Sequence, residues 1–131
     1  MLKKVYVTKE FSFEAAHHLV NYDGDCANLH GHSYKLQVTV SGSIDPKDQT
    51  YASDCMVIDF KGLKSIVDAF IIGTHDHKDL NTIYDNPTAE IMVISMFDTI
   101  NSILPRDIKL ESVKLWETAT SYAEYRGEDC E

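Results

Sequence analysis

The sequence lacks the features that mark secreted, membrane-spanning and nucleic-acid-binding proteins. Its three cysteines, Cys26, Cys55 and Cys130, are odd in number and widely spaced, so they form no disulfide framework and fit a reducing cytoplasm. No apolar run approaches the roughly 20 residues that span a bilayer, and the N-terminus has no apolar signal-peptide core. A net charge of −9 argues against nucleic-acid binding. We therefore expect a cytoplasmic protein with neither a membrane nor a nucleic-acid partner.

Alternating apolar residues predict four β-strands. Residues 3–14 and 33–42 show the two-residue period of strands that bury one face. Residues 107–117 and 121–126 are predicted as two further strands, and a change of apolar phase within the third suggests a β-bulge. No repeat or low-complexity segment divides the chain, so we expect a single domain over residues 1–131.

Two helices are predicted between the second and third strands. The first has apolar residues at helical spacing, begins after Asp59 as its N-cap and ends near Gly73. The second begins with Pro87 at its first helical position and ends before Pro105. The order β-β-α-α-β-β predicts an α+β fold, a four-stranded antiparallel sheet with both helices on one face. Its open edges favour oligomerisation into a barrel.

Four of the six histidines lie close together near the start of the chain. His30 and His32 are two residues apart, so on an extended backbone both imidazoles point to one face. The preceding strand ends at His17 and His18, and these neighbours should point to opposite faces. Three imidazoles with an open fourth position are typical of a catalytic zinc site. We predict that His17, His30 and His32 bind Zn²⁺ and that His18 does not.

Cys26 lies four residues before His30 in a turn-like segment. As a fourth ligand it would close the site and make it structural. As a free residue beside a divalent cation, its thiolate is favoured and can act as a nucleophile or a base. The residues leave both roles open, and we favour the catalytic one.

The last two histidines, His75 and His77, flank Asp76 in a polar loop. An Asp–His pair can act as an oriented acid–base couple. The alternative is a histidine at the end of a helix that interacts with the helix dipole. Farther along, Glu117 continues an apolar strand face, so it either anchors a ligand or reaches solvent.

Six motifs in order, covering almost the whole chain, carry a resemblance to a known family. They are FEAAH at 13–17, CANLHGHSY at 26–34, VIDF at 57–60, DHKDLN at 76–81, NPTAE at 86–90 and WET at 116–118. With them the chain resembles the 6-pyruvoyl-tetrahydropterin synthase / 6-carboxy-tetrahydropterin synthase family, which has the tunnelling fold (T-fold). The resemblance implies an enzyme of this fold.

The resemblance also implies a role for each matching residue. The three histidines match the zinc ligands, and Cys26 matches the active-site cysteine that accepts a proton. Asp76 and His77 match an acid–base pair that serves a site between neighbouring subunits, although an assignment that uses His75 stays open. Glu117 matches the catalytic-site carboxylate that holds the amino and ring N–H groups of the pterin. The family implies a homohexamer in which trimers close barrels and two trimers stack.

The substrate that the resemblance implies is 7,8-dihydroneopterin triphosphate. A carboxy-forming branch cleaves the side chain to give 6-carboxy-5,6,7,8-tetrahydropterin, acetaldehyde and triphosphate in queuosine biosynthesis. Only three residues separate Cys26 from the HGH motif, a short spacing that resembles this branch. The alternatives are 6-pyruvoyl-tetrahydropterin synthase, which does not cleave the side chain, and a non-catalytic zinc- or pterin-binding module. Lys35 and Lys78 are candidates for triphosphate binding by charge alone.

Overall fold

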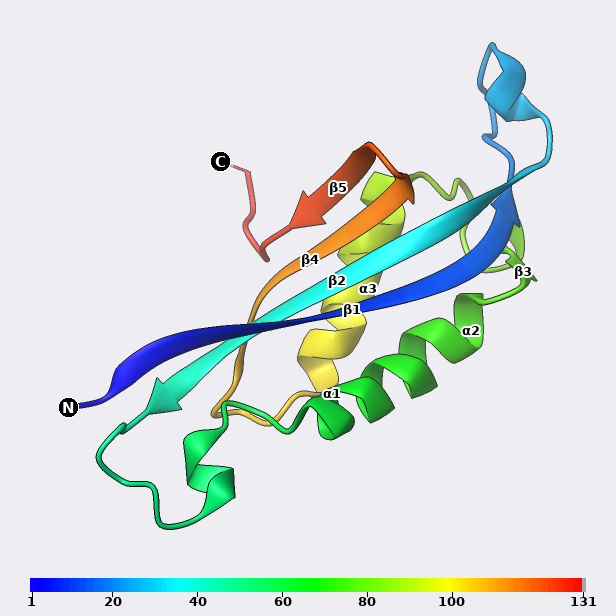
Figure 1. Cartoon of the computed structure of the whole chain (residues 1–131). Coiled ribbons are helices and arrows are strands. Elements are labelled where there is room, and N and C mark those ends of the chain that lie inside the picture. Colours follow the sequence, from blue (N-terminus) through cyan, green and yellow to red (C-terminus); the bar gives the residue numbers. More distant parts are fainter. Residues whose placement is uncertain (131) are drawn as a thin grey trace.

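The computed structural model describes residues 1–130, which form an α+β fold around one curved sheet (Figure 1). The elements in order are β1 (Lys3–His17), β2 (His30–Ile44), α1 (Phe60–Val67), a π-helical turn (Asp68–Ile72), α2 (Gly73–His75), β3 (Lys78–Asp79), α3 (Ala89–Ile103), β4 (Lys109–Thr118) and β5 (Ser121–Tyr125). Short 3₁₀ turns lie at Asp25–Ala27, Ala52–Cys55 and Leu80–Thr82. Within the described residues, no helix has the length and hydropathy that crossing a membrane requires.

The sheet has five strands in the order β3-β1-β2-β4-β5. β1 and β2 pair antiparallel along their whole length, from Lys3 opposite Ile44 to His17 opposite His30. The prediction of a four-stranded, wholly antiparallel sheet is wrong in one respect. A fifth strand, β3, pairs parallel with β1 at Ala15 and Ala16. Because β3 is only two residues long, it is too short to show an alternating pattern in the sequence.

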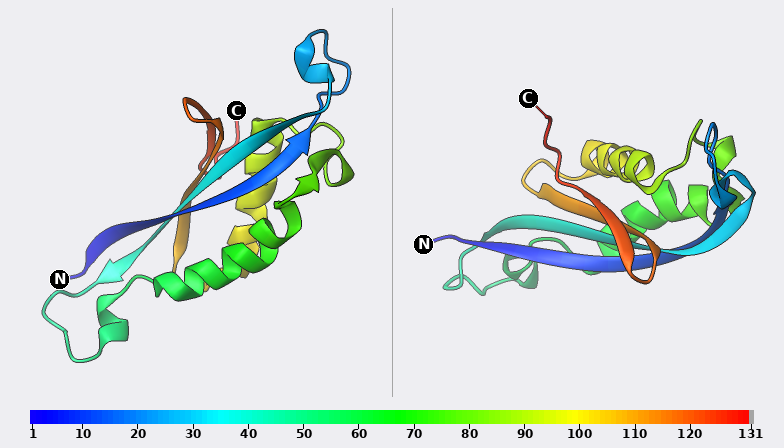
Figure 2. Two further views of the ribbon diagram at one scale, coloured as in Figure 1. Left: turned by 45° about the vertical axis from the view of Figure 1, so that its right-hand side comes forward. Right: turned by 90° about the horizontal axis from the view of Figure 1, so that it is seen from above.

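Both helical segments cover the same face of the sheet, as predicted (Figure 2). The predicted inward face of β2 is confirmed, because Tyr34, Leu36 and two valines are at most 1 % exposed within the single core. The apolar face of β1 is buried only toward its C-terminal end. Val5 is 38 % exposed because the N-terminal part of the β1–β2 ribbon extends beyond the helices (Figure 1).

The helix boundaries differ slightly from the prediction. Asp59 is the N-cap of α1, and its carboxylate accepts a hydrogen bond from the Lys61 N–H. Helical structure then continues through the π-helical turn to His75, two residues past the predicted end at Gly73. α3 begins after Thr88, whose hydroxyl accepts a hydrogen bond from the Ile91 N–H. Pro87 is therefore outside the helix, which corrects its predicted place at the first helical position.

The predicted bulge in the third long strand is confirmed. Thr39 pairs with Ser112 and Val40 pairs with Leu110, so Glu111 is the extra residue. This insertion lets Leu110 and the residues after Ser112 bury their apolar side chains in one core despite the change of phase. Beyond this bulge, Lys35 pairs with Trp116, and a second register shift, in the pairing of β4 with β5, lies between Trp116 and Thr118, where Glu117 stands.

Candidate metal centre

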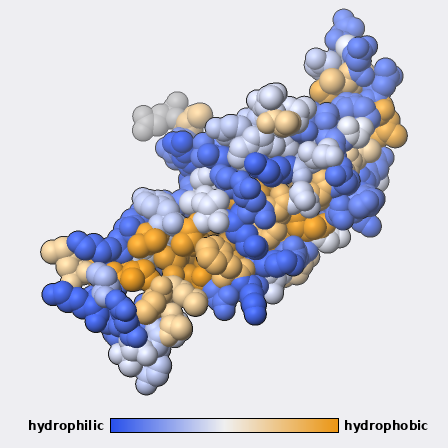
Figure 3. Space-filling view, in the orientation of Figure 1, coloured by the Kyte–Doolittle hydropathy of each residue, from blue (hydrophilic) through white to orange (hydrophobic). Residues whose placement is uncertain are grey.

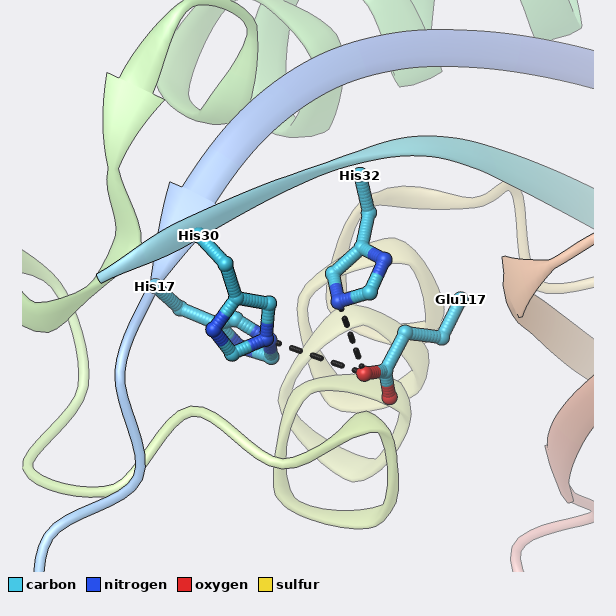
Figure 4. Close-up of side chains that lie close together, drawn as sticks. All are labelled: His17, His30, His32 and Glu117. Carbon is cyan, nitrogen blue, oxygen red and sulfur yellow. Dashed lines mark ion pairs between the residues drawn. The ribbon is translucent and has the colours of Figure 1, made fainter. Parts of the chain in front are cut away.

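The three predicted histidine ligands converge on the helix-covered face at one end of the sheet (Figure 4). His17 lies directly opposite His30 in the β1–β2 ladder, and His32 points to the same face two residues later. The centroids of their rings are 4.6 to 5.1 Å apart. One ligand atom from each histidine and one carboxylate oxygen of Glu117 all lie within 4.8 Å of one another. The strand register therefore gathers four metal-binding side chains at one point.

Main-chain carbonyl groups orient two of these rings. The Nδ1 atom of His17 is 2.7 Å from the carbonyl oxygen of Pro87, and the Nδ1 atom of His30 is 2.7 Å from that of Asn28. A carbonyl oxygen only accepts hydrogen bonds, so each neutral ring carries its proton on Nδ1 and a lone pair on Nε2. Such a partner for the remote nitrogen is typical of histidines that bind metal ions.

The buried Nε2 atoms show that the residues fit a metal ion. The Nε2 atoms of His17, His30 and His32 are inaccessible to solvent and have no hydrogen-bond partner within the described chain. Leaving such an atom unpaired costs about 1–3 kcal/mol. Burial also lowers the pKa of His32, although Glu117 opposes this effect, so its ring favours the neutral, metal-binding form. Three imidazole nitrogens and one carboxylate oxygen match the donor set of a four-coordinate Zn²⁺.

Cys26 lies on the 3₁₀ turn between β1 and β2 and is half-buried with a free thiol. The Leu19 N–H donates a hydrogen bond to the Cys26 carbonyl oxygen and ties this turn to the end of β1. The cluster of candidate ligands includes Glu117 and not Cys26. Its predicted role as a reactive residue rather than a ligand stays a prediction.

Asp76 and His77 form a pair at the edge of the sheet. The Nδ1 atom of His77 is 3.0 Å from the Asp76 carboxylate, which also accepts a hydrogen bond from the Glu14 N–H. That Glu14 bond, more than the contact with His77, lowers the pKa of Asp76, so the carboxylate stays ionised beside the imidazole. The His77 N–H in turn donates to the Glu14 carbonyl oxygen, and His77 has a left-handed φ of 59°. This strained, doubly fixed loop is typical of functional sites.

The pair does not lie among the metal ligands of its own chain. His77 is exposed and lines an open hollow of about 530 Å³ together with Glu14, Ser33 and His32, the one proposed metal ligand that borders this hollow. Glu14 and Ser33 occupy the strand positions that point away from the buried face of the sheet, where Phe13 and Tyr34 pack. Asp76 and His77 therefore face outward beside the edge of the sheet.

His75 is a buried core residue with a partner at each ring nitrogen, which favours His77 over His75 as the partner of Asp76. It is 4 % exposed, its Nδ1 atom is 2.7 Å from the Ile71 carbonyl oxygen, and its Nε2 atom is 2.7 Å from the Tyr84 hydroxyl. Both ring nitrogens are thus occupied, and no lone pair faces the solvent. Its ring also packs against Phe13.

Several residues that hold the site were missed from the sequence. The Asn81 side chain binds the main chain of His18, and the Asn86 side chain binds that of Val20 in the same way. These bonds fasten the segment that leaves β1, and they turn His18 toward Asn81, outside the predicted metal site. Both asparagines belong to motifs that were recognised, but their partners lie more than 60 residues away. The carbonyl groups of Pro87 and Asn28 leave no signal in any side-chain pattern.

The two lysines suggested for triphosphate binding have different environments. The Nζ atom of Lys35 lies 4.4 Å from the centre of the Trp116 ring and 3.5 Å from a Glu10 carboxylate oxygen. Lys78 lines the same hollow as His77. Of the two, Lys78 is therefore the one placed beside the acid–base pair.

A second hollow lies beside Glu117. It has a volume of about 460 Å³ and is lined by Glu117, by Ala89 and Glu90 from the first turn of α3, and by residues of β5 that include Tyr122. Glu117 therefore belongs both to this hollow and to the histidine cluster.

Together, the curved sheet and its three-histidine cluster define an α+β protein with a candidate metal centre, whose Glu117 also lines a ligand-sized hollow. A family model described as 6-pyruvoyl tetrahydropterin synthase matches residues 6–128. The chain is 38 % identical to 6-carboxy-5,6,7,8-tetrahydropterin synthase of Haemophilus influenzae, with 92 % of this chain and 97 % of that protein aligned. It is 36 % identical to dihydroneopterin monophosphate aldolase of Pyrococcus furiosus, with 87 % of this chain and 90 % of that protein aligned.

The structural comparison agrees with these matches. The solved structure of 6-pyruvoyl tetrahydropterin synthase from Caenorhabditis elegans superposes with a TM-score of 0.81 at 27 % identity. It covers 96 % of this chain and 97 % of that chain. The chain therefore belongs to the 6-pyruvoyl tetrahydropterin synthase family of T-fold enzymes.

We predict that His30→Ala loses bound zinc and that His18→Ala keeps it. Each variant removes one imidazole side chain, but only His30 presents an unpaired Nε2 atom to the cluster. We expect zinc affinity to fall at least about tenfold in the first variant, in line with the cost of disturbing a metal site. Metal content after dialysis, measured by plasma mass spectrometry, checks this. Equal zinc content in the two variants would contradict the assignment.

We predict that the stabilising effect of His75 depends on pH. Burial lowers its pKa below the ordinary value, against the opposing Ile71 hydrogen bond, so the unfolded chain binds this proton more readily than the folded protein. The contribution is therefore complete above pH of about 6.5 and is lost as the pH falls through the lower, folded pKa.

His75→Gln, which cannot titrate, provides the comparison. At neutral pH, we expect the free energy of unfolding of metal-free His75→Gln to be about 1–3 kcal/mol lower than that of the metal-free parent, because buried hydrogen bonds are lost. This difference should shrink at acidic pH in urea unfolding experiments. A difference that is constant or grows as the pH falls would show that His75 does not titrate as its burial requires.

Proposed function

We propose that the protein is a zinc-dependent 6-carboxy-5,6,7,8-tetrahydropterin synthase. It converts 7,8-dihydroneopterin triphosphate to 6-carboxy-5,6,7,8-tetrahydropterin, acetaldehyde and triphosphate, a reaction of queuosine biosynthesis. The observation that carries the proposal is the cluster of three buried, unpaired Nε2 atoms together with Glu117, a carboxylate that also lines a ligand-sized hollow. The H. influenzae relative, aligned over nearly its whole length, bears the name of this activity.

The hollow between α3 and β5 is the proposed pterin site. Glu117 is one of its lining residues, and a carboxylate there can accept two parallel hydrogen bonds from the amino and ring N–H groups of a pterin. Bound in this way, the pterin directs its side chain toward His17, His30 and His32. A Zn²⁺ ion held by these histidines supplies Lewis-acid chemistry, which polarises side-chain hydroxyl groups and acidifies the adjacent C–H bonds.

Proton transfers are assigned to Cys26 and His77. Cys26, on the turn beside the ends of β1 and β2, accepts a proton at its Sγ atom. His77 has its Nδ1 atom against Asp76, so its Nε2 atom is the one free to exchange a proton with the substrate. Asp76 fixes the ring by holding Nδ1, and the Glu14 main chain fixes both residues of the pair.

The outward direction of Asp76 and His77 supports a site shared between subunits. Because the pair lies on the exposed side of the sheet edge, we propose that it completes the site of a neighbouring subunit in a homohexamer of two stacked trimers. An exposed apolar groove lined by Val5, Met56 and Phe60 is consistent with subunit contact. Apolar surface gathers over the part of β1 that extends beyond the helices (Figure 3).

The reaction itself is tested by mass-spectrometric analysis of products from zinc-loaded protein and 7,8-dihydroneopterin triphosphate. We expect 6-carboxy-5,6,7,8-tetrahydropterin with acetaldehyde in equal amounts. Cys26→Ala should retain zinc and lose turnover by about two orders of magnitude or more, because it removes a proton acceptor. Loss of zinc in this variant would make Cys26 a ligand and overturn its catalytic role.

Other products would identify another member of the family. A 6-pyruvoyl product without acetaldehyde would establish the pyruvoyl-forming activity, which is the alternative proposal. Cleavage to a different aldehyde would favour an aldolase like the P. furiosus relative. Pterin binding without turnover would leave only a binding module.

Mixed oligomers test the shared site. Cys26→Ala and His77→Ala should each be inactive alone, whereas co-assembled subunits should regain about a quarter of the parent activity, because random pairing places an intact Cys26 opposite an intact His77 in that share of sites. Steady-state rates of co-expressed, doubly tagged oligomers provide the measurement. A mixture that stays as inactive as its parts would show that one chain supplies both residues to its own site.

A further inference from the structure

The Glu117 carboxylate lies where no hydrogen bond explains its position. Its Oε1 atom is 3.0 Å from His32 Nε2 and 3.6 Å from His17 Nε2 (Figure 4). The Pro87 carbonyl oxygen holds the proton of His17 on Nδ1, so His17 Nε2 presents a lone pair to this oxygen. His32 Nε2 also makes no bond of acceptable geometry, despite the short distance. An anionic oxygen beside the lone pair of His17 Nε2 is repelled unless a cation lies between them.

The carboxylate has no other stabilising partner among residues 1–130. Its only ion-pair contacts there are with His17 and His32, at 3.6 Å and 3.0 Å, and neither contact is a hydrogen bond of acceptable geometry. Lysine and arginine side chains of the described chain pair with Glu10, Asp68, Glu111 and Glu124 instead. A cation held by the three imidazoles would supply the positive charge that this oxygen otherwise lacks.

We propose that Glu117 is the fourth ligand of the metal ion while the pterin site is empty, and that it leaves the metal when a pterin binds. The inference rests on the proposed pterin site. Glu117 borders both the histidine cluster and the hollow between α3 and β5, and its side chain is partly exposed. Holding a pterin by two parallel hydrogen bonds occupies both carboxylate oxygens, so the same group cannot also serve the metal equally well.

The exchange couples substrate binding to an open metal position. With the hollow empty, three imidazoles and one carboxylate complete a closed, four-coordinate set. With a pterin in the hollow, Glu117 turns to the ring, and the fourth position becomes available to the side chain of that same pterin. Ligands that do not engage Glu117 meet a closed site, so the carboxylate contributes to specificity as well as to affinity.

Cobalt provides the measurement, because four-coordinate Co²⁺ absorbs visible light far more strongly than five- or six-coordinate Co²⁺. We expect the Co²⁺-loaded parent protein to show an intense band without any pterin. Glu117→Gln, which keeps the shape of the side chain but not its charge, should shift and weaken that band and lower Co²⁺ affinity about tenfold or more. Glu90→Gln, a change in the same hollow but away from the cluster, should keep the parent band.

Titration with unsubstituted pterin tests the exchange. This probe has the ring edge that Glu117 would bind but no side chain that could reach the metal. Its binding, followed by pterin fluorescence, should shift the Co²⁺ band of the parent protein and leave that of Glu117→Gln unchanged. Identical bands in the parent and in Glu117→Gln before titration would overturn the role of Glu117 as a ligand.

The two proposals fail in different ways. Pterin that binds without moving the parent band would overturn the exchange, while the pterin site would stand. Pterin that does not bind at all would overturn both the proposed function and the exchange. The role of Glu117 as a ligand would then be decided by the spectra recorded without pterin.

Discussion

The site depends on three imidazole nitrogens that the fold buries without giving them a partner inside the chain. His17, His30 and His32 reach one point only because β1 and β2 pair in one register. A slip of one residue would turn His30 and His32 to the opposite face. The register is held by the core, where Phe13 stacks on Tyr34 at 4.9 Å directly next to the histidines. Core packing and metal binding therefore support each other along the same two strands.

Segments far apart in the chain complete the centre around this ladder. Pro87, just before the N-cap of α3, supplies the carbonyl oxygen that orients His17. The side chains of Asn81 and Asn86 bind the main chain of the segment that follows His17. The far end of β4 brings Glu117 to the cluster. Each of these elements contributes one group to the centre, so the helices position the site as well as covering the sheet. A metal ion bound there would link β1, β2 and β4 at their common end.

Much of this arrangement could be predicted from the sequence, because the periodicity of apolar and polar residues indicates which side chains share one face of a strand. The i, i+2 spacing of His30 and His32 and the ending of the preceding strand at His17 were enough to predict convergence, which the structure confirms. The change of apolar phase likewise indicated the bulge at Glu111. Main-chain acceptors such as the Pro87 carbonyl could not be predicted, because they depend on position and not on residue type. Nor could the approach of Glu117 to His32, which requires the pairing of β2 with β4 in three dimensions.

Anomalous X-ray diffraction from crystals of the purified protein tests the central claim most directly. Data collected on both sides of the zinc absorption edge locate the ion independently of any assumption about its ligands. The account predicts one zinc peak per chain, between the Nε2 atoms of His17, His30 and His32 and within bonding distance of all three, roughly 2.0–2.1 Å. A zinc peak at Cys26 without these histidines, or a protein that binds no zinc while its three Nε2 atoms stay buried, would contradict it.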